Sequence, residues 1–130
     1  MSIAQSLYTW LTANSAIEAY VADRIYPHYI PQHSAARPCL TYSQEGGEKI
    51  RHLSGVSDTR ISEFSIDAWS LSYLEAKNLA ETVTTELDGV RGSFGSHTAE
   101  QVRLLNEFDV EPEPDTGLYR VSMRFEIVYY

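Results

Sequence analysis

The chain has 130 residues, of which 43% are hydrophobic and 22% are charged, and its formal net charge is -8 at pH 7. This length and composition predict a single soluble globular domain, and they exclude a disordered or fibrous protein. The acidic balance argues against a protein that grips nucleic acid by neutralising phosphates, because such proteins need a concentrated basic surface.

Two short helices are predicted at the start of the chain. Ser2 and Gln5 have the spacing of a capping box. The apolar residues that follow fall on one helical face, namely Ile3, Leu7, Trp10 and Leu11. Asn14 or Ser15 can cap a second helix, and the apolar side of that helix consists of Ile17, Tyr20 and Val21.

An irregular connector and two strands are predicted next. The prolines of YPHYIPQHSAARP, residues 26–38, push the residues before them out of the helical region. The stretches CLTYSQE, residues 39–45, and TRISEFSIDAWS, residues 59–70, are typical of strands, and in the second Phe64, Ile66 and Ala68 share one face. Between them lies the polar stretch GGEKIRHLSGVSD, residues 46–58, which is too long for a tight hairpin turn. We expect it to be a functional or disordered loop.

A third helix and two further strands are predicted in the second half. Ser72 and Glu75 form another capping box, and the helix after them has an apolar face of Ala76, Leu79, Ala80, Val83 and Leu87. A strand over AEQVRLLNEFDV, residues 99–110, is ended by the prolines of EPEPD. In the closing stretch TGLYRVSMRFEIVYY, apolar residues alternate with polar ones from Tyr119 to Tyr129, which predicts a half-buried strand.

The order of these elements predicts an α+β fold in one domain over residues 1–130. We expect a mixed, mostly antiparallel four-stranded sheet with helices packed on it, in the order α-α-β-β-α-β-β. Phe125 and Ile127 should be buried against Leu79 and Val83. Apolar residues recur every second position in the closing strand and every 3.6 positions in the third helix, which places each pair on the apolar face of its element.

The side-chain chemistry predicts no catalytic, cofactor or metal site. The four histidines lack the i, i+4 pairing of a helical zinc site and have no cysteine pair near them; they are His28, His33, His52 and His97. The stretch GVRGSFG follows a helix and precedes a strand, which is the reverse of a phosphate-binding loop. Cys39 lies in a predicted strand without an obvious base, so a buried structural thiol is favoured. We therefore expect no enzyme activity and no cofactor.

Two charged stretches leave alternatives open. Carboxylates alternate near the end of the third predicted strand, at Glu107, Asp109, Glu111, Glu113 and Asp115. They could form a weak divalent-cation site, or a solvated acidic edge that protects the sheet from unwanted pairing. In the predicted loop, Lys49, Arg51 and His52 could contact an acidic partner or simply be solvated.

Other features bear on location. No apolar run approaches the ~18 residues of a candidate membrane-spanning helix. The first residues lack the basic region of a signal peptide. We expect a cytosolic chain with no membrane contact. Nine tyrosines against four phenylalanines suit either interfaces or the edges of a small core.

Several phrases, taken in chain order, resemble a known family. They are DRIYP at 23–27, RPCLTY at 37–42, FSIDAWS at 64–70, SYLEAKNLAETV with LDG at 87–89, and the closing TGLYRVSMRFEIVYY. Together they are similar to the tail completion, or tail terminator, proteins of long-tailed bacteriophages. The segments 28–36 and 46–58 match in position and polarity only.

The resemblance implies a structural virion protein at the head-proximal end of the tail, made in the host cytoplasm and without catalysis. Such proteins form a six-membered ring on the last ring of the tail tube, stop tube growth and present a surface to the head connector, or stopper, while DNA passes through without specific binding. Alternatives are another neck or minor tail component, or a small ligand-binding or enzymatic module. The candidate contacts with the tube or a neighbour are Lys49, Ile50, Arg51, His52, Leu53, Asp23, Arg24, Tyr26, Trp69 and Tyr73.

Overall fold

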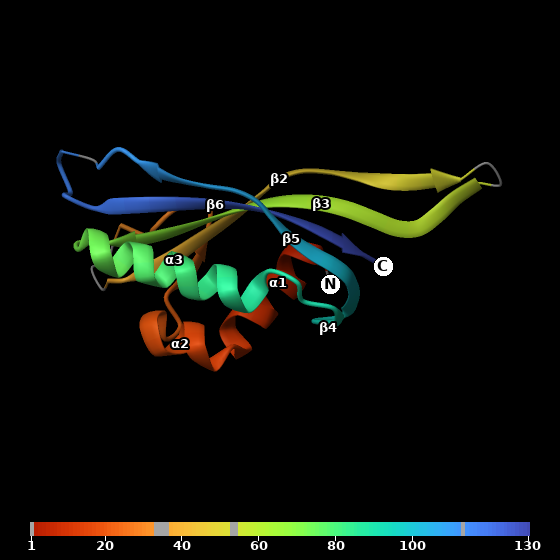
Figure 1. Cartoon of the computed structure of the whole chain (residues 1–130), viewed down its shortest axis with the longest axis horizontal. Helices are drawn as coiled ribbons and strands as arrows, with labels where there is room; N and C mark the ends of the chain where they lie inside the picture. Colours follow the sequence, from red (N-terminus) through yellow and green to blue (C-terminus); the bar gives the residue numbers. More distant parts are fainter. Residues whose placement is uncertain (1, 33–36, 53–54, 113) are drawn as a thin grey trace.

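The computed structural model describes residues 2–32, 37–52, 55–112 and 114–130, and over 48–52 and 55–58 it describes the backbone alone. Within these residues the chain forms a six-stranded sheet with three helices against one face (Figure 1). The helices are α1 (Ile3–Ala13), α2 (Ser15–Val21) and α3 (Tyr73–Leu87). The strands are β1 (Ile25–Pro27), β2 (Cys39–His52), β3 (Gly55–Ser70), β4 (Gly92–Phe94), β5 (His97–Val110) and β6 (Tyr119–Tyr129).

The first two helices begin where the sequence predicts. Ser2 accepts a hydrogen bond from the Gln5 backbone at 3.2 Å, and the Gln5 side chain accepts one from the Ser2 backbone at 2.8 Å. Both halves of the capping box are therefore present. Asn14, and not Ser15, caps α2 by accepting from the Ile17 backbone at 3.1 Å.

The capping box predicted at Ser72 and Glu75 is only half formed. Ser72 accepts from the Glu75 backbone at 3.4 Å, as predicted. The Glu75 side chain instead accepts from the Ser70 hydroxyl at 2.6 Å, and that hydroxyl accepts from the Ser72 backbone at 3.1 Å. In a complete capping box the Glu75 carboxylate would accept directly from the Ser72 backbone N–H. Here the Ser70 hydroxyl lies between them and bonds to both. The buried Ser70 hydroxyl is satisfied by this arrangement, which links the end of β3 to the start of α3.

The sheet has the strand order β1-β2-β3-β6-β5-β4 within the described residues. Of its pairs, β1 with β2 is parallel and the others are antiparallel. The predicted mixed, mostly antiparallel character is confirmed, but the predicted number of four strands is wrong. The two additional strands, β1 and β4, have three residues each and lie at the two edges. Segments this short carry too few alternations to be recognised from the sequence.

The predicted loop over residues 46–58 is also wrong for the part that is described. β2 continues to His52 and β3 begins at Gly55, with Arg51 opposite Val56. β6 pairs with β3 only as far as Arg60, so the strands beyond this point form a two-stranded ribbon that projects from the sheet (Figure 1). We call residues 49–52 and 55–60 the arm. No helix layer covers this ribbon (Figure 1), so the fold does not require apolar residues to alternate along it, and its sequence looks like a loop.

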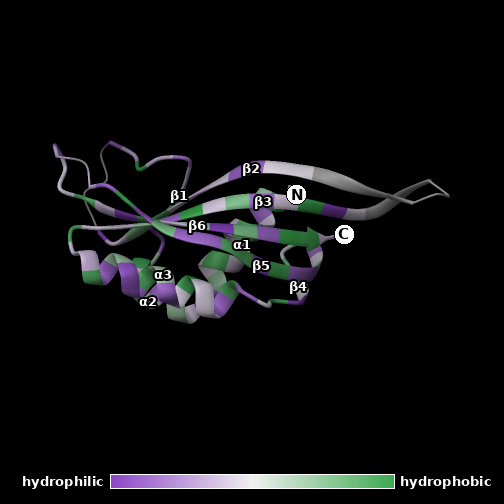
Figure 2. Cartoon of the chain, turned by 45° about the horizontal axis from the view of Figure 1, so that its top comes forward, coloured by the Kyte–Doolittle hydropathy of each residue, from purple (hydrophilic) through white to green (hydrophobic). Residues whose placement is uncertain are grey.

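The main core lies between the helices and the sheet. Phe125 and Ile127 are fully buried in the same apolar cluster as Leu79 and Val83 of α3, which confirms the predicted faces. Apolar residues of α1 and α2 complete that cluster. Figure 2 shows the resulting alternation of hydrophobic and hydrophilic residues along the strands.

A smaller core lies on the opposite face of the sheet. Cys39, Trp69 and Leu118 are buried there, with Tyr26 and Ile30 packed against them. Burial raises the pKa of the Cys39 thiol to about 11, although the charges of Arg37 and Arg24 oppose this. The thiol is therefore protonated and shielded at neutral pH, and the prediction of a buried cysteine is confirmed.

A close contact joins α1 to the turn between β4 and β5. Ser6 is fully buried, and its hydroxyl lies 2.7 Å from Nδ1 of His97 and accepts from the Ser96 backbone at 3.3 Å. Burial lowers the pKa of His97, which favours the neutral ring. Gly95 has a φ of +61° and lies against the backbone of Ser6.

In the described part of the chain, none of the helices combines the length and apolar character needed to cross a bilayer.

Candidate assembly surfaces

The molecule is elongated, and its two ends differ. The arm extends at one end, while the other end holds the β5–β6 connection and the start of α3 (Figure 1). The connector between β1 and β2 packs near this second end through Ile30, which lies against the cluster of Cys39, Trp69 and Leu118. These two ends are the candidate surfaces for contact with other proteins.

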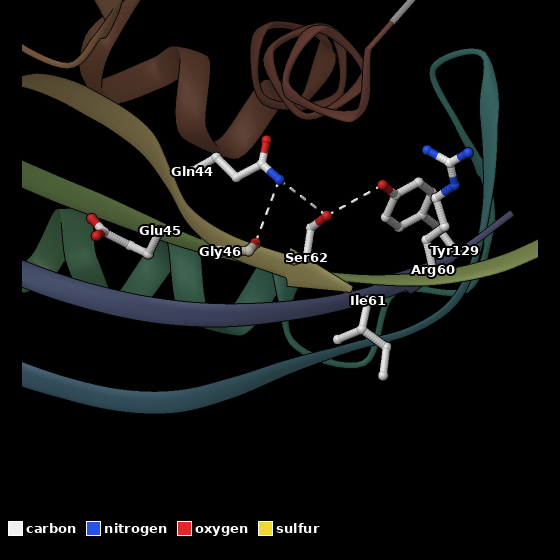
Figure 3. Close-up of a pocket in the computed structure, with 8 residues that line it drawn as sticks. Gln44, Glu45, Gly46, Arg60, Ile61, Ser62 and Tyr129 are labelled. Atoms are coloured by element: carbon white, nitrogen blue, oxygen red, sulfur yellow. Dashed lines mark hydrogen bonds between the residues drawn. The ribbon is translucent and has the colours of Figure 1, made fainter. Parts of the chain in front are cut away.

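The base of the arm is tied to the body by a chain of polar side chains (Figure 3). Gln44 of β2 donates to the Ser62 hydroxyl of β3 at 3.3 Å and to the Gly46 carbonyl at 3.4 Å. The Ser62 hydroxyl lies 3.2 Å from the Tyr129 hydroxyl of β6. Three strands are thereby linked at the point where the arm leaves the sheet. An open hollow of about 600 Å³ beside this chain is lined by Gln44, Glu45, Gly46, Gly47, Arg60, Ile61, Ser62 and Tyr129.

The backbone at this point also has a defined irregularity. The register of β2 against β3 shifts between Gln44 and Gly46, as at a β-bulge, and bulges bend a strand and increase its twist. A Cβ at Gly47 would lie 3.1 Å from the Ile61 carbonyl oxygen, tighter than ordinary contact. The direction of the arm is therefore set by local structure at its base. The hollow itself contains no pairing of a nucleophile with a base.

A polar network orients an aromatic side chain at the start of α3. Tyr73 donates to Asp109 at 2.6 Å, and Lys77 donates to the other oxygen of the same carboxylate at 3.0 Å. These hydrogen bonds lower the pKa of Asp109, the bond from Tyr73 first, and they raise the pKa values of Tyr73 and Lys77. Because the network is exposed to solvent, it contributes little to stability. It holds the ring of Tyr73, which remains 41% exposed, in one place.

The alternating carboxylates do not gather into a metal site in the described part of the chain, where no three His, Cys, Asp or Glu residues are placed to hold an ion. Asp109 is already bound by Tyr73 and Lys77. Glu107 and Glu111 are exposed, and Glu113 lies outside the described residues. An exposed acidic edge accounts for the arrangement of the described carboxylates.

A pocket of about 430 Å³ lies at the end away from the arm. We call it the basic pocket; its lining is His28, Tyr29, Ile30, Pro31, Gln32, Arg37, Trp69, Thr116, Leu118 and Arg120. The guanidinium of Arg120 lies 5.0 Å from the centre of the Trp69 ring and 3.9 Å from the Asp67 carboxylate. Its Nε is buried and has no hydrogen-bond acceptor among the described residues. The pocket therefore combines cationic groups with an aromatic wall.

The predicted contact residues fall into different settings. Lys49, Ile50, Arg51 and His52 belong to the strand that forms one side of the arm, whereas Leu53 lies outside the described residues. Asp23 is exposed, and Tyr26 is half-buried against the smaller core. The structure thus groups four of the predicted residues in one projecting element, and their contacts stay a prediction.

Two of the predicted contact residues have structural roles. Arg24 donates to the Pro38 carbonyl at 2.9 Å and to the Tyr20 carbonyl at 3.1 Å, which ties α2 to the start of β2. Trp69 is 9% exposed and donates to the Thr41 hydroxyl at 2.9 Å. Trp69 also lines the basic pocket.

Sequence reasoning missed several exposed residues at the end away from the arm. Arg37 and Arg120 line the basic pocket, and Tyr29 at its rim is 72% exposed. Leu71, just before α3, and Leu74, in its first turn, are 64% and 71% exposed. Little in the sequence indicated this: Leu74 stands outside the apolar face of α3, and single exposed apolar residues are common.

Comparisons with known proteins were made for sequence and for structure. A family model described as "Tail completion protein gp17" matches residues 5–130. No match was found among curated proteins. A chain in the solved structure "Virion of native gene transfer agent (GTA) particle" is similar with a TM-score of 0.74 and 16% sequence identity. The alignment covers 98% of this chain and 91% of that one, so the two share a fold over nearly their whole length.

Proposed function

Because the chain belongs to the tail completion protein gp17 family, and is therefore a structural protein of a bacteriophage tail, we propose that it forms a hexameric ring that caps the tail tube. The ring ends polymerisation of the tube and provides the surface to which the head connector is joined. The family match over residues 5–130 carries this proposal. The chain of similar fold from a gene transfer agent virion supports a place within a particle.

The need for such a cap follows from how a tube grows. A protein that polymerises by head-to-tail stacking has no intrinsic stop, because each added ring exposes the same surface as the ring before it. A cap must match the tube on one side and differ from it on the other. The elongated subunit, with an arm at one end and the basic pocket at the other, has two dissimilar ends of the required kind.

The charge of the chain suits a ring with DNA in its channel. A net charge of -8 leaves few partners for phosphates, so DNA can pass through without specific binding. We expect free subunits to be monomeric or weakly associated. Ring closure then occurs on the tip of the tube, where neighbouring subunits are held at a high effective concentration.

We assign the arm to the tube side of the ring, where it contacts the tube protein or a neighbouring subunit. It projects beyond the sheet, and the hydrogen bonds from Gln44 through Ser62 to Tyr129 fix its base. Its Lys49, Ile50, Arg51 and His52 are the candidate contacts, together with Leu53.

Shortening the arm should weaken capping without unfolding the subunit. Removing residues between Gly46 and Asp58 is expected to give tails of irregular length in a milder form than loss of the whole protein. The reason is that the arm lies outside the main core. Tail lengths measured in electron micrographs, with thermal melting of the purified variant as the control, check this. Tails of uniform, normal length would remove the arm from the tube contact.

The function itself is tested by a phage that lacks this protein. Its lysate should contain filled heads that are not joined to tails, and tails of excessive or irregular length. Supplying the intact protein from a plasmid should restore joined particles and uniform tails, which controls for effects on neighbouring genes. Tails of normal, uniform length attached to heads in the mutant lysate would overturn the assignment.

A further inference from the structure

The basic pocket is not used by the capping activity assigned to the arm. We propose that this pocket is the site at which the ring binds its head-side partner, and that it receives a carboxylate flanked by an apolar side chain of that partner. The proposal rests on the proposed function, because it assumes a ring with a tube side and a head side. Beyond that function, the proposal states where the head-side partner binds and which of its side chains the pocket recognises.

The guanidinium of Arg120 is held in position by its neighbours and still has donors for a carboxylate. Trp69 lies beside it, with 5.0 Å between the guanidinium carbon and the ring centre, and Trp69 is itself held by Thr41. The 3.9 Å separation from Asp67 is longer than a hydrogen bond. The Nε is buried without an acceptor among the described residues, but the side chain as a whole is 34% exposed, so an incoming group would meet the terminal nitrogens of the guanidinium. A planar fork of N–H donors in this state suits a carboxylate, which can accept two parallel hydrogen bonds.

The remaining lining supports an anion and an apolar neighbour. Arg37 and His28 add cationic or proton-donating groups to the same pocket. Ile30 and Leu118 supply apolar wall, and Tyr29 stands at the rim with most of its side chain exposed. Exposed aromatic side chains and arginine are enriched where proteins bind one another.

The position of the pocket favours a head-side partner over the tube. It lies at the end of the molecule away from the arm, and the arm is assigned to the tube side. The arm of another copy is a poor occupant, because its described strands contain three basic residues, Lys49, Arg51 and Arg60, against one acidic residue, Asp58. Bringing these positive charges to a basic pocket would be repulsive.

The test uses Arg120→Gln in the full-length protein, with Arg103→Gln as the matched control. Both changes neutralise one arginine with an amide, but Arg103 pairs with Glu126 in the sheet and does not line the pocket. Tails made with Arg120→Gln should have normal, uniform length, and their joining to filled heads should fall by about tenfold or more, as expected for loss of a charge-assisted hydrogen bond. Arg103→Gln should leave joining unchanged.

A second variant keeps the test independent of folding. Tyr29→Ala removes a side chain that is 72% exposed, so it should leave thermal melting unchanged while reducing joining. Normal joining with both pocket variants would overturn the proposal. Irregular tail length with either variant would also overturn it, because the pocket would then contact the tube or a second copy. The proposed function is tested by a different result: it fails if the phage that lacks the protein has uniform tails attached to heads.

Discussion

Replacing Phe125 with alanine is expected to lower the free energy of unfolding by about 3–5 kcal/mol, the usual cost of truncating a buried phenylalanine. Phe125 is fully buried in β6 and lies between two paired strands, opposite Phe64 of β3 and Leu104 of β5. A cavity there would face the buried side of α3, whose Leu79 and Val83 share its cluster. Such a loss is a large part of the stability of an ordinary domain.

Chemical denaturation of the purified protein measures this effect. Phe125→Leu should recover a substantial part of the loss, because leucine refills some of the volume. Tyr130→Ala is the surface control, since Tyr130 is exposed, and it should change the unfolding free energy by less than about 0.5 kcal/mol. Thermal melting gives a second check: if the melting temperature of Phe125→Ala lay within a degree of that of the parent, the assigned core face would be wrong.

Replacing Gly95 with alanine is expected to cost roughly 3 kcal/mol, from backbone strain and overpacking together. The φ of +61° at Gly95 is unfavourable for a residue with a side chain, and an added Cβ would lie 2.6 Å from Cα of Ser6. Because the obstacle is helix backbone, it cannot be relieved by rotating a side chain. Either α1 or the turn between β4 and β5 must move.

Gly117→Ala separates the two causes of that loss. Gly117 has a φ of +66°, close to that of Gly95, but nothing lies within 4 Å of the Cβ that it would gain. Its substitution should therefore cost strain alone, and less than Gly95→Ala. The two variants are compared by urea denaturation. Equal losses would show that the contact between Gly95 and Ser6 contributes nothing.

The elements that could be predicted from the sequence are those with one buried face. β6 places Val121, Met123 and Phe125 in the core at alternate positions, and α3 buries Leu79 and Val83 one turn apart. Burial on one face imposes the periodicity from which both were predicted. The capping residue Ser2 was equally informative, because its hydrogen bond is made within four residues of sequence.

The elements that could not be predicted lack such a constraint. The arm leaves the sheet, so no helix layer selects apolar residues at alternate positions. β1 and β4 are three residues long, which is too short to show a periodicity, and β1 is defined by pairing with a partner further along the chain, as Ile25 is with Leu40. The basic pocket draws Tyr29, Trp69 and Arg120 from separate segments. The resemblance to a family indicated a tail protein. The order of residues along the sequence cannot show which distant residues meet at one end of the fold.

The central place of β6 has a consequence for the timing of synthesis. β6 follows every other described element in chain order, yet it lies between β3 and β5. While the ribosome is still translating residues before 119, the strands that β6 joins cannot form one sheet, and the apolar face of α3 has no complete surface to cover. Tyr129, which ties the base of the arm, emerges later still. We expect chains without β6 to be unable to join the capping ring, so that assembly is limited to subunits in which the sheet has formed around β6.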